Sequence, residues 1–446
     1  MNNDTWYPLC RPDDGRIQIR SAEGIYLYDI RGKKYIDANS GLWNVPLGYS
    51  NVSLKDKLVE QLDKIQYVNA CEFSTEEADQ LSAILKAIHH DQIEKIVYTC
   101  TGSESVELSI KFIRKYASLK NKRKNIAVLQ HSYHGSYYGS MSCSDYDGRE
   151  REGYGPLLPG IKELSLPFCS CCRSNAVSEV CEQKMKQRLE QELEDFGDSL
   201  AGIIIEPVLG SGGVITLPEW YVHRIDIYAK EHDILIAFDE VATGFGRTGK
   251  MFCYQHYNIK PDIITMSKAM NNGILPIGAV AVSKKIVEQF RKHKEFIFHL
   301  STQNGNALCC AAAIAAINEI QKDNGALLDH AQEMGHYFYN KIENDFMEKY
   351  SRIFDIRRCG MMFAIDFLES DMQKKMGYGD LINMVTLLKK YGVITEWSYI
   401  ENVTSCIVLF LPYIIEVAQI DMLLEKLELT FKRIIAYQKQ SGDMSS

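Results

Sequence analysis

The chain has 446 residues, of which 46% are hydrophobic and 24% are charged, and its formal net charge at pH 7 is -8. This length exceeds the usual size of one domain, so we expect two domains, one of them large. The composition is that of an ordinary soluble globular protein. The acidic balance and the absence of a long basic run disfavour nucleic-acid binding.

The first ten residues, MNNDTWYPLC, contain neither a basic nor an apolar segment, so no secretory signal is expected. No run reaches the roughly 18 apolar residues that a membrane span needs. Thirteen cysteines are scattered through the chain, an odd number that fits a reducing compartment better than a disulfide framework. We therefore expect a cytoplasmic protein and, from its size, an enzyme.

The N-terminal 50 residues contain short β-like pieces and end in the segment 40–48, which is too rich in glycine and proline for a helix. The same segment is unusually apolar for a surface loop. It either packs under a neighbouring domain or lines a pocket. Trp43 and Asn44 are the side chains best suited to the second role.

A strand predicted over 95–101 runs directly into Gly102 and Ser103, which open a helix. Small residues at a helix start leave backbone N–H groups unpaired, with the positive end of the helix dipole behind them. This pattern is typical of a phosphate site, and it also occurs in an ordinary helix N-cap. The preceding residues, 51–90, have the apolar periodicity of helices.

A strand predicted over 125–130 is followed by an aromatic loop that contains His131, Tyr133 and His134. A His-x-x-His pair has the spacing of metal ligands, but here it lacks an acidic third ligand and a helical frame. An aromatic loop after a strand suits stacking on a flat ligand better, with Tyr133 as the candidate.

Four cysteines lie close together in the sequence, at Cys169, Cys171, Cys172 and Cys181. Such a group raises the question of a zinc site. Cys171 and Cys172 are adjacent, however, and neither a second C-x-x-C pair nor a histidine pair follows. We therefore expect no metal in this protein.

Three further apolar runs each end in residues able to do chemistry. The runs are 201–205 before Glu206, 234–238 before Asp239, and 263–266 before Ser267 and Lys268. Short, continuously apolar runs are typical of buried parallel strands, and ligands bind at the carboxyl ends of such strands. Asp239 and Lys268 are thus expected to share one site, with the amine as nucleophile and the carboxylate as electrostatic anchor. Without the lysine nearby, Asp239 would be taken as a buried salt-bridge or cap residue.

Strand–helix alternation from about residue 95 to 285 predicts βα crossovers and a mostly parallel sheet. An alanine-rich helix follows at 307–320, and the composition then changes to long amphipathic helices alternating with short strands. We expect a large domain over 56–330 and a smaller α+β domain over 331–446. The segment 1–55 is expected to join the smaller domain.

Residues 244–250, Gly-Phe-Gly-Arg-Thr-Gly-Lys, imitate the phosphate loop of a nucleotide hydrolase, and 234–240 imitate its Walker B strand. Met251 stands where a serine or threonine must bind magnesium. The two elements are also only a few residues apart and in the wrong order. This interpretation is therefore rejected.

The same residues belong to a set of motifs that resembles the class III aminotransferases, the ω-type branch of the pyridoxal-phosphate enzymes with the aspartate-aminotransferase fold. The motifs cover nearly the whole chain in the family's order: Gly41-Leu-Trp43, Thr101-Gly-Ser-Glu104, Tyr133-His-Gly135, Glu206-Pro207, Phe238 to Gly249, Ser267-Lys268, Pro276-Ile-Gly278 and Gly305-Asn306. Even the cysteine loop is similar to a Cys-Tyr-Arg-Cys loop of the family. The resemblance implies an α/β fold, in which a large cofactor-binding domain has a mostly parallel, mixed sheet flanked by helices. The N- and C-terminal segments would build the smaller α+β domain.

The resemblance also implies roles for the candidate residues. Lys268 would form a Schiff base with pyridoxal 5′-phosphate and then move a proton between the substrate Cα and the cofactor C4′. Asp239 would keep the pyridine nitrogen protonated, and Glu206 would lie near the ring hydroxyl and the substrate. The remaining matches are Gly102 and Ser103 at the phosphate, Tyr133, His134 and Val241 around the ring, Trp43 on the substrate side with Tyr133, and Thr302, which would reach the phosphate of the other subunit. An obligate homodimer is therefore implied.

One departure from the family bears on the substrate. Members that bind α-carboxylates commonly carry an arginine in the small domain, shortly before a Pro-Pro pair, and here Val408 falls nearest to that position. An aliphatic side chain cannot replace a bidentate arginine. We hypothesise that at least one substrate lacks a small α-carboxylate, or that Arg357 or Arg358 substitutes. An amine, an aldehyde, an amino sugar or a carrier- or peptide-bound substrate would fit.

Two other functions share the same scaffold. A decarboxylase or aminomutase would use the same residues around the cofactor, and only the consumption of an amino acceptor separates them from an aminotransferase. A catalytically idle scaffold paralogue is disfavoured because both Lys268 and Asp239 are present.

Overall fold

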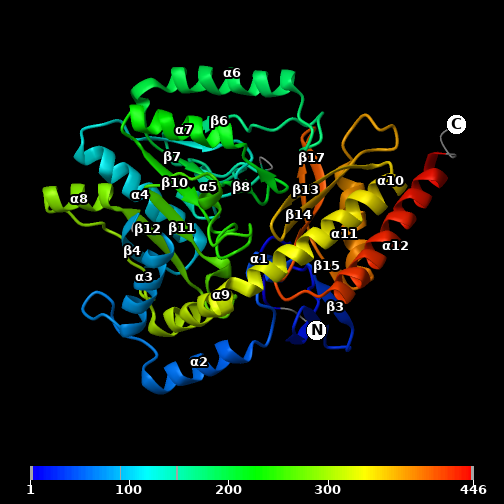
Figure 1. Ribbon diagram of the computed structural model, residues 1–446, viewed down its shortest axis with the longest axis horizontal. Helices are drawn as coiled ribbons and strands as arrows, with labels where there is room; N and C mark the ends of the chain where they lie inside the picture. The colour runs from blue at the N-terminus through cyan, green and yellow to red at the C-terminus, as the bar shows by residue number, and fades with distance from the viewer. Residues whose placement is uncertain (1–3, 91, 147–148, 443–446) are drawn as a thin grey trace.

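The computed structural model describes residues 4–90, 92–146 and 149–442, and its centre is a seven-stranded sheet (Figure 1). The strands lie in the order β4-β12-β11-β10-β7-β5-β6. Their bounds are β4 (Ile93–Thr99), β5 (Asn125–Leu129), β6 (Ile161–Leu164), β7 (Leu200–Ile205), β10 (Leu235–Asp239), β11 (Ile263–Met266) and β12 (Gly278–Ser283). Strand β12 is antiparallel to both neighbours, whereas the other paired strands are parallel. The predicted mostly parallel, mixed sheet is confirmed.

Helices cover both faces of this sheet. Helices α4 and α8 share one apolar core with it, and α3, α7 and α9 share a second core on the other face. The helices of this part are α2 (Val52–Lys64), α3 (Glu76–Ile88), α4 (Gly102–Leu119), α5 (Tyr138–Ser142), α6 (Glu179–Phe196), α7 (Glu219–Glu231), α8 (Lys284–His293) and α9 (Ala307–Lys341). Strands β7, β10 and β11 are buried along their whole length, which explains why their sequences are continuously apolar. The helical stretch predicted over 51–90 is two helices, α2 and α3.

A smaller four-stranded antiparallel sheet, in the order β13-β14-β17-β16, lies beside the large one. Its elements, with the helices α11 and α12 that pack on it, are β13 (Ile353–Cys359), β14 (Met362–Phe367), α11 (Tyr378–Lys390), β16 (Glu396–Ile400), β17 (Thr404–Phe410) and α12 (Val417–Gly442). A third sheet joins the two ends of the chain, because β15 (Val393–Ile394) pairs in parallel with β3. The N-terminal strands are β1 (Ile19–Glu23), β2 (Tyr26–Asp29) and β3 (Lys34–Asp37). A smaller additional domain with N- and C-terminal contributions was predicted and is present.

Helix α9 connects the large sheet to the smaller one. Its backbone leaves helical geometry at 322–325, directly after the predicted alanine-rich helix. The domain boundaries near 55 and 330 stay predictions, and the second falls within this helix. The remaining elements are β8 (Val208–Leu209), β9 (Ile215–Thr216), α10 (Met347–Lys349), short 3-10 turns at Gly197–Ser199, Cys253–His256 and Lys268–Asn271, and a π turn at Ile342–Phe346.

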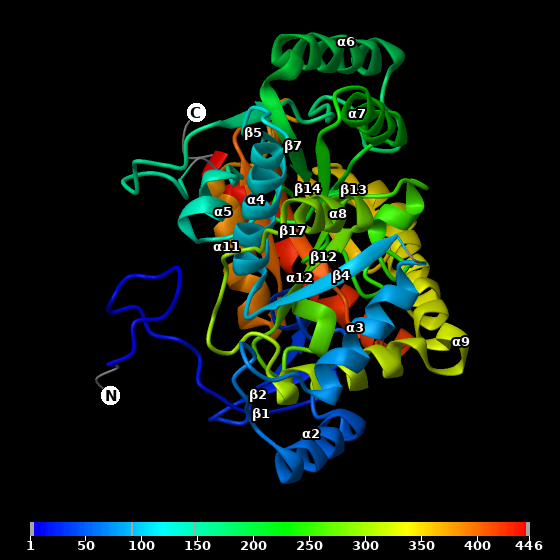
Figure 2. The ribbon, with the colours of Figure 1, turned by 90° about the vertical axis from the view of Figure 1, so that its left-hand side faces the viewer.

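The two ends of the molecule carry different helices. In both views, α6 and α7 lie at the top and α2 lies at the bottom (Figures 1 and 2).

Within the described ranges, no helix combines the length and the apolar character needed to cross a membrane.

The segment 40–48, for which we predicted no helix, contains one helical turn, α1 (Ser40–Trp43), and this turn is left-handed. The φ angles of its four residues run from 45° at Ser40 to 70° at Trp43. A left-handed turn of L-residues costs about 1–2 kcal/mol per residue, so other contacts must hold it. The buried Asp37 carboxylate does so by accepting hydrogen bonds from Gly41 N (2.7 Å), Asn39 N (3.1 Å) and Tyr49 Oη (2.6 Å).

Candidate active site

The loops that follow β4, β5, β7, β10 and β11 meet around one cavity of about 160 Å³. These five strands are mutually parallel, so their carboxyl ends lie at one edge of the sheet, as the sequence predicted. The three predicted catalytic residues, Lys268, Asp239 and Glu206, line the cavity. The predicted cofactor and substrate contacts Trp43, Gly102, Ser103, Tyr133, His134 and Val241 line it as well.

Lys268 follows β11 and is half-buried because its side chain borders the cavity. Its backbone is left-handed, with φ 40°, which is strained for a lysine and typical of a functional position. The Nζ atom lies 4.2 Å from the centroid of the Trp43 ring. Desolvation by the surrounding protein lowers the pKa of Lys268 to about 8, against the opposing charges of Asp239 and Glu206. A usable fraction of this amine is therefore neutral near physiological pH.

Asp239 is the last residue of β10, and both of its carboxylate oxygens are held in place. Oδ1 accepts hydrogen bonds from Thr265 Oγ1 (3.0 Å) and Val241 N (3.1 Å), and Oδ2 lies 2.7 Å from His134 Nδ1. Burial alone would lower the pKa of His134, but the hydrogen bond and charge of Asp239 raise it. His134 thus orients the carboxylate, a partnership that a sequence motif alone does not reveal.

Glu206 follows β7 and is a second buried carboxylate beside the same cavity. Oε1 accepts a hydrogen bond from Tyr133 N (2.7 Å), and Oε2 accepts one from Gly210 N (3.3 Å). Burial raises the pKa of Glu206 to about 7, although the His134 charge opposes the rise. The Glu206 carboxyl group can therefore hold or release a proton near neutral pH.

The N-terminus of α4 faces the cavity through Gly102 and Ser103. Thr101 accepts hydrogen bonds from Ser105 N through its carbonyl (3.0 Å) and from Glu104 N through its hydroxyl (3.1 Å), so the amides of Gly102 and Ser103 are the ones left to an anion. A Cβ atom on Gly102 would lie 2.8 Å from Val241 Cγ1, which explains the glycine. Ser103 Oγ accepts a hydrogen bond from Ser136 N (3.1 Å), which ties the aromatic loop to the helix start.

Arg247 is a fully buried residue near the site whose importance the sequence did not indicate. Its guanidinium donates to Leu411 O (2.9 Å) and to Trp43 O (3.3 Å). The charge of Arg247 also contributes to the lowered pKa of Lys268. In the sequence this arginine stood inside the rejected phosphate-loop motif. The one feature of the sequence that could have drawn attention to Arg247 is its position among the glycines of the segment 244–250.

Trp43 lines the cavity, and its ring is stacked on Phe410 at a centroid distance of 4.3 Å and an interplanar angle of 8°. Thr302, by contrast, is exposed and does not line the cavity of its own chain. Its neighbour Ser301 donates to Glu104 Oε1 (2.6 Å), so the loop is attached beside the start of α4. The cross-subunit role of Thr302 stays a prediction.

A statistical model of the family described as aminotransferase class-III matches residues 11–431. The chain belongs to this family. It is 35% identical over 329 residues to an acetylornithine aminotransferase of Aquifex aeolicus, covering 73% of this chain and 79% of that one. An acetylornithine aminotransferase of Methanocaldococcus jannaschii is 30% identical over 449 residues, with 97% and 100% covered. The crystal structure of an (S)-enantioselective omega-transaminase from Thermomicrobium roseum matches with a TM-score of 0.88 and 27% identity, covering 96% of each chain.

Class III aminotransferases depend on pyridoxal 5′-phosphate, and the chemistry of the cavity fits this group. The cavity offers a nucleophilic amine, a fixed carboxylate, a helix start suited to an anion, and an aromatic and an aliphatic side chain against which a flat ring can pack. These are Lys268, Asp239, the α4 N-terminus, Tyr133 and Val241. The chain is thus a pyridoxal-phosphate-dependent aminotransferase, with an amino donor and a keto-acid acceptor as its general substrates.

Proposed function

We propose that this aminotransferase moves an amino group from an amine or ω-amino donor to a carbonyl acceptor, with Lys268 as the residue that holds the cofactor. The observation that carries the proposal is one cavity shared by the Lys268 amine, of lowered pKa, and the fixed Asp239 carboxylate. The bound cofactor supplies an electron sink. The proposal is tested by incubating the protein with amines and keto acids and identifying both products. Release of carbon dioxide, or rearrangement without consumption of an acceptor, would favour the decarboxylase or aminomutase alternative.

Each neighbouring residue has a part in this proposal. Lys268 would hold the cofactor through its neutral amine and would carry the proton taken from the substrate Cα. Asp239 would hold a proton on the ring nitrogen, and Glu206 would hold one near the ring hydroxyl. The amides of Gly102 and Ser103 would bind the phosphate, and Tyr133 and Val241 would pack against the ring.

Attachment of the cofactor to cofactor-free protein should follow the pKa of Lys268, which burial lowers to about 8. A lowered pKa increases the neutral, nucleophilic fraction at any pH below it, so the rate should rise about tenfold per pH unit below 8 and level off above it. Stopped-flow absorbance between pH 6 and 10 measures this. The matched comparison is the amine of Nα-acetyl-lysine, whose rate should keep rising toward pH 10. A protein rate that also rises to pH 10 would contradict the assignment.

We further propose that one substrate lacks a small α-carboxylate. Arg357, Ala364, Val408 and Glu396 lie opposite one another in the strands β13, β14, β17 and β16. Val408 is two residues from Phe410, so both belong to the sheet face that meets Trp43. Apart from Arg357, which is paired with Asp366, that row carries the small or aliphatic Ala364 and Val408 and the acidic Glu396.

Neither alternative arginine is available to a substrate carboxylate. Arg357 is paired with Asp366 (2.8 Å) and also donates to Gly213 O (2.7 Å). Arg358 is bonded to His336 (2.8 Å). Neither of them lines the catalytic cavity. This supports an acceptor or donor whose distal part is neutral or cationic, such as an amine, an aldehyde, an amino sugar or a carrier- or peptide-bound group.

Glu396→Gln should raise kcat/KM for carboxylate acceptors. Burial raises the pKa of Glu396, which disfavours its charge, and a substrate carboxylate nearby would have to share the site with whatever fraction of Glu396 is ionised. Removing the charge should improve kcat/KM for 2-oxoglutarate about tenfold, or about 1.4 kcal/mol. Glu401→Gln, at an exposed position on the adjoining turn, is the matched control and should change nothing. Equal kcat/KM in wild type and Glu396→Gln, or low-KM turnover of simple keto acids by wild type, would refute the proposal.

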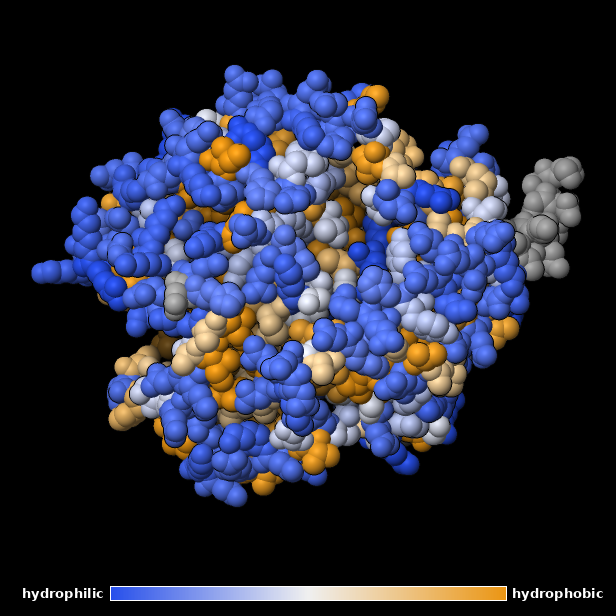
Figure 3. Space-filling view, viewed as in Figure 1, coloured by the Kyte–Doolittle hydropathy of each residue, from blue (hydrophilic) through white to orange (hydrophobic). Residues whose placement is uncertain are grey.

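We also propose that the enzyme is an obligate homodimer in which Thr302 reaches the partner's phosphate site. The segment before Thr302 supports this because it exposes Phe296, Phe298 and Leu300. Apolar residues also gather on the lower part of one face, the region of α2 and α9 (Figure 3). Light scattering should give the mass of two chains.

Subunit mixing tests the cross-subunit role of Thr302. Lys268→Ala and Thr302→Ala subunits should each form weakly active dimers. In a mixed dimer, one site has an intact Lys268 and receives Thr302 from the partner subunit. Mixing should therefore restore activity, and no gain on mixing would contradict the shared site.

A cytoplasmic location is proposed on the state of the cysteines. All thirteen are free thiols, at both exposed and buried positions. Free thiols persist in reducing compartments. Fractionation of the source cells tests this, with recovery outside the cytoplasm as the contrary result.

A further inference from the structure

Four cysteine sulfurs converge at one point on the surface, away from the catalytic cavity. Cys169, Cys171 and Cys172 belong to the loop between β6 and α6, and Cys181 belongs to the first turn of α6. All four Sγ atoms lie within 4.8 Å of one another. The recorded separations are 2.9 Å for Cys169–Cys171, 3.4 Å for Cys169–Cys181, 3.8 Å for Cys172–Cys181, and 3.9 Å for both Cys171–Cys172 and Cys171–Cys181.

Three of the five separations, at 3.8, 3.9 and 3.9 Å, match a tetrahedron of sulfurs around one metal ion, whereas the two that involve Cys169 are shorter. Zinc–sulfur bonds of about 2.3 Å in tetrahedral geometry put the sulfurs about 3.8 Å apart. A disulfide would need two sulfurs about 2.0 Å apart, and none of the recorded pairs is that close. The arrangement therefore has the geometry of a metal site.

The start of helix α6 favours a thiolate at Cys181. Cys181 is the third residue of this 18-residue helix, where the positive end of the helix dipole stabilises a negative sulfur. Ser178 caps the helix by accepting a hydrogen bond from Cys181 N (3.3 Å), which fixes the position of the fourth sulfur.

We propose that Cys169, Cys171, Cys172 and Cys181 bind one zinc ion as a closed, four-thiolate structural site. Each thiol that becomes a ligand releases its proton to solvent, and neither the metal nor the sulfurs change oxidation state. The expectation that this protein has no metal is thereby reversed. In the sequence, the adjacency of Cys171 and Cys172 argued against a site. In the fold, the helix α6 brings the fourth sulfur back to the other three.

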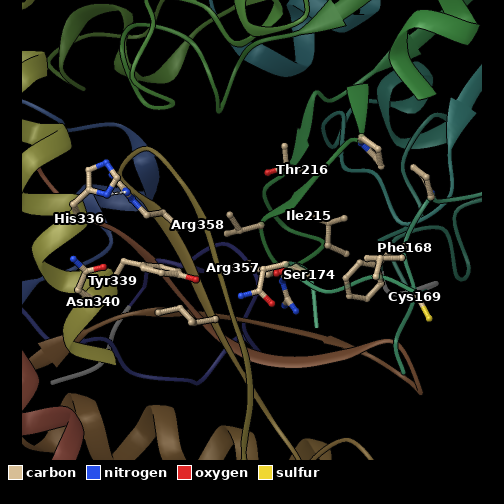
Figure 4. A pocket seen from close by; sticks show the side chains of 16 residues that line it. Phe168, Cys169, Ser174, Ile215, Thr216, His336, Tyr339, Asn340, Arg357 and Arg358 are labelled. Atoms are coloured by element: carbon tan, nitrogen blue, oxygen red, sulfur yellow. Dashed lines mark hydrogen bonds between the residues drawn. The ribbon is translucent and has the colours of Figure 1, made fainter. Parts of the chain in front are cut away.

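The zinc ion would hold the middle of a long loop whose start is already fixed by hydrogen bonds between Ser165 and Glu192. Residues 165–178 contain no helix or strand, and loops of this length in a compact fold usually have a function. Ser174 anchors the loop to the smaller sheet through Asp355, by hydrogen bonds of 3.1 Å from its amide and 3.2 Å from its hydroxyl. Phe168 and Cys169 form one side of a cavity of about 510 Å³, with His336 and Tyr339 opposite them (Figure 4). Zinc bound to the four cysteines would keep Phe168 and Cys169 in position at the side of this cavity.

Metal analysis of the untagged holoenzyme tests the proposal. Protein produced in zinc-supplemented medium and dialysed against EDTA should retain about one zinc per chain by mass spectrometry of the metals. Cys172→Ser and Cys181→Ser should each lose the zinc while the visible absorption of the bound cofactor shows that the protein is folded. Cys71→Ser, an exposed cysteine outside the cluster, is the matched control and should keep it. Unchanged zinc in the two cluster variants, or no zinc in wild type, would overturn the site.

Two further measurements keep the test decisive if a variant is insoluble. Zinc-free wild type titrated with Co²⁺ should develop strong thiolate-to-cobalt absorption that saturates at about one ion per chain. Trypsin should cut after the exposed Arg173 in the zinc-free protein and be slowed by zinc. Absence of the cobalt bands contradicts the proposal. So does an intact mass that is lower by the two hydrogens of a disulfide in zinc-free protein, or iron in place of zinc.

Discussion

Lys268→Ala should lower kcat/KM by about 10⁴-fold or more and remove the visible absorption of the purified protein. The substitution deletes both the nucleophile that holds the cofactor and the base that moves the substrate proton, and a positioned base alone contributes about 10²–10⁴-fold. The amine of Lys268 is the only lysine amine that lines the catalytic cavity in the described part of the chain. Steady-state kinetics and an absorbance spectrum measure the two effects together.

Lys260→Ala is the matched control, because Lys260 is exposed and lies on the segment that leads into β11. It should keep both the colour and the rate of the wild type. Added methylamine should restore part of the rate of Lys268→Ala, since a small neutral amine can enter the space that the side chain leaves. An unchanged spectrum in Lys268→Ala would refute the central assignment.

Asp239→Asn should lower kcat by about 10²–10³-fold, the range seen when one preorganised electrostatic partner is lost. An amide cannot supply the negative charge that keeps a ring nitrogen protonated, and the neutral ring accepts electrons poorly. The same change removes the partner that raises the pKa of His134. The pKa of His134 should therefore fall in this variant. Kinetics gives the first effect, and NMR titration of the His134 ring protons gives the second.

Asp226→Asn is the control for the general cost of removing a buried aspartate. Asp226 is buried on α7, pairs with Lys230 (2.6 Å) and does not line the cavity. Its replacement should affect thermal stability without lowering kcat. A wild-type kcat in Asp239→Asn would remove the electrostatic role assigned to this carboxylate.

The sequence alone predicted much of the large sheet and the core of the site, for a physical reason. Parallel strands buried on both faces must be continuously apolar, so the runs that became β7, β10 and β11 were visible in the sequence. The polar residue directly after each run then had to lie at the carboxyl edge of the sheet. That reasoning brought Asp239 and Lys268 together before any contact was known.

Long-range contacts account for most of what the sequence did not predict. The left-handed turn at Ser40–Trp43 depends on the Asp37 carboxylate, and no local pattern signals a chain of positive φ angles. The structural role of Arg247 depends on hydrogen bonds to two carbonyls that are far away in the sequence, so no local pattern could indicate it. The four cysteines failed the usual spacing rules because a helical turn, and not a second paired motif, completes their geometry.

The partners of Arg247 bear on the order in which the molecule is made. Its guanidinium bonds to carbonyls at residues 43 and 411, which leave the ribosome at nearly opposite ends of synthesis. Until the second carbonyl emerges, directly after β17, the arginine lacks one of its two carbonyl acceptors, and burying it would be unfavourable. A nascent or truncated chain that lacks Leu411 therefore cannot complete the buried surroundings of Lys268. Lys268 packs on Trp43, and Trp43 stacks on Phe410, so the burial that lowers the pKa of Lys268 is complete only once the chain has been made through β17.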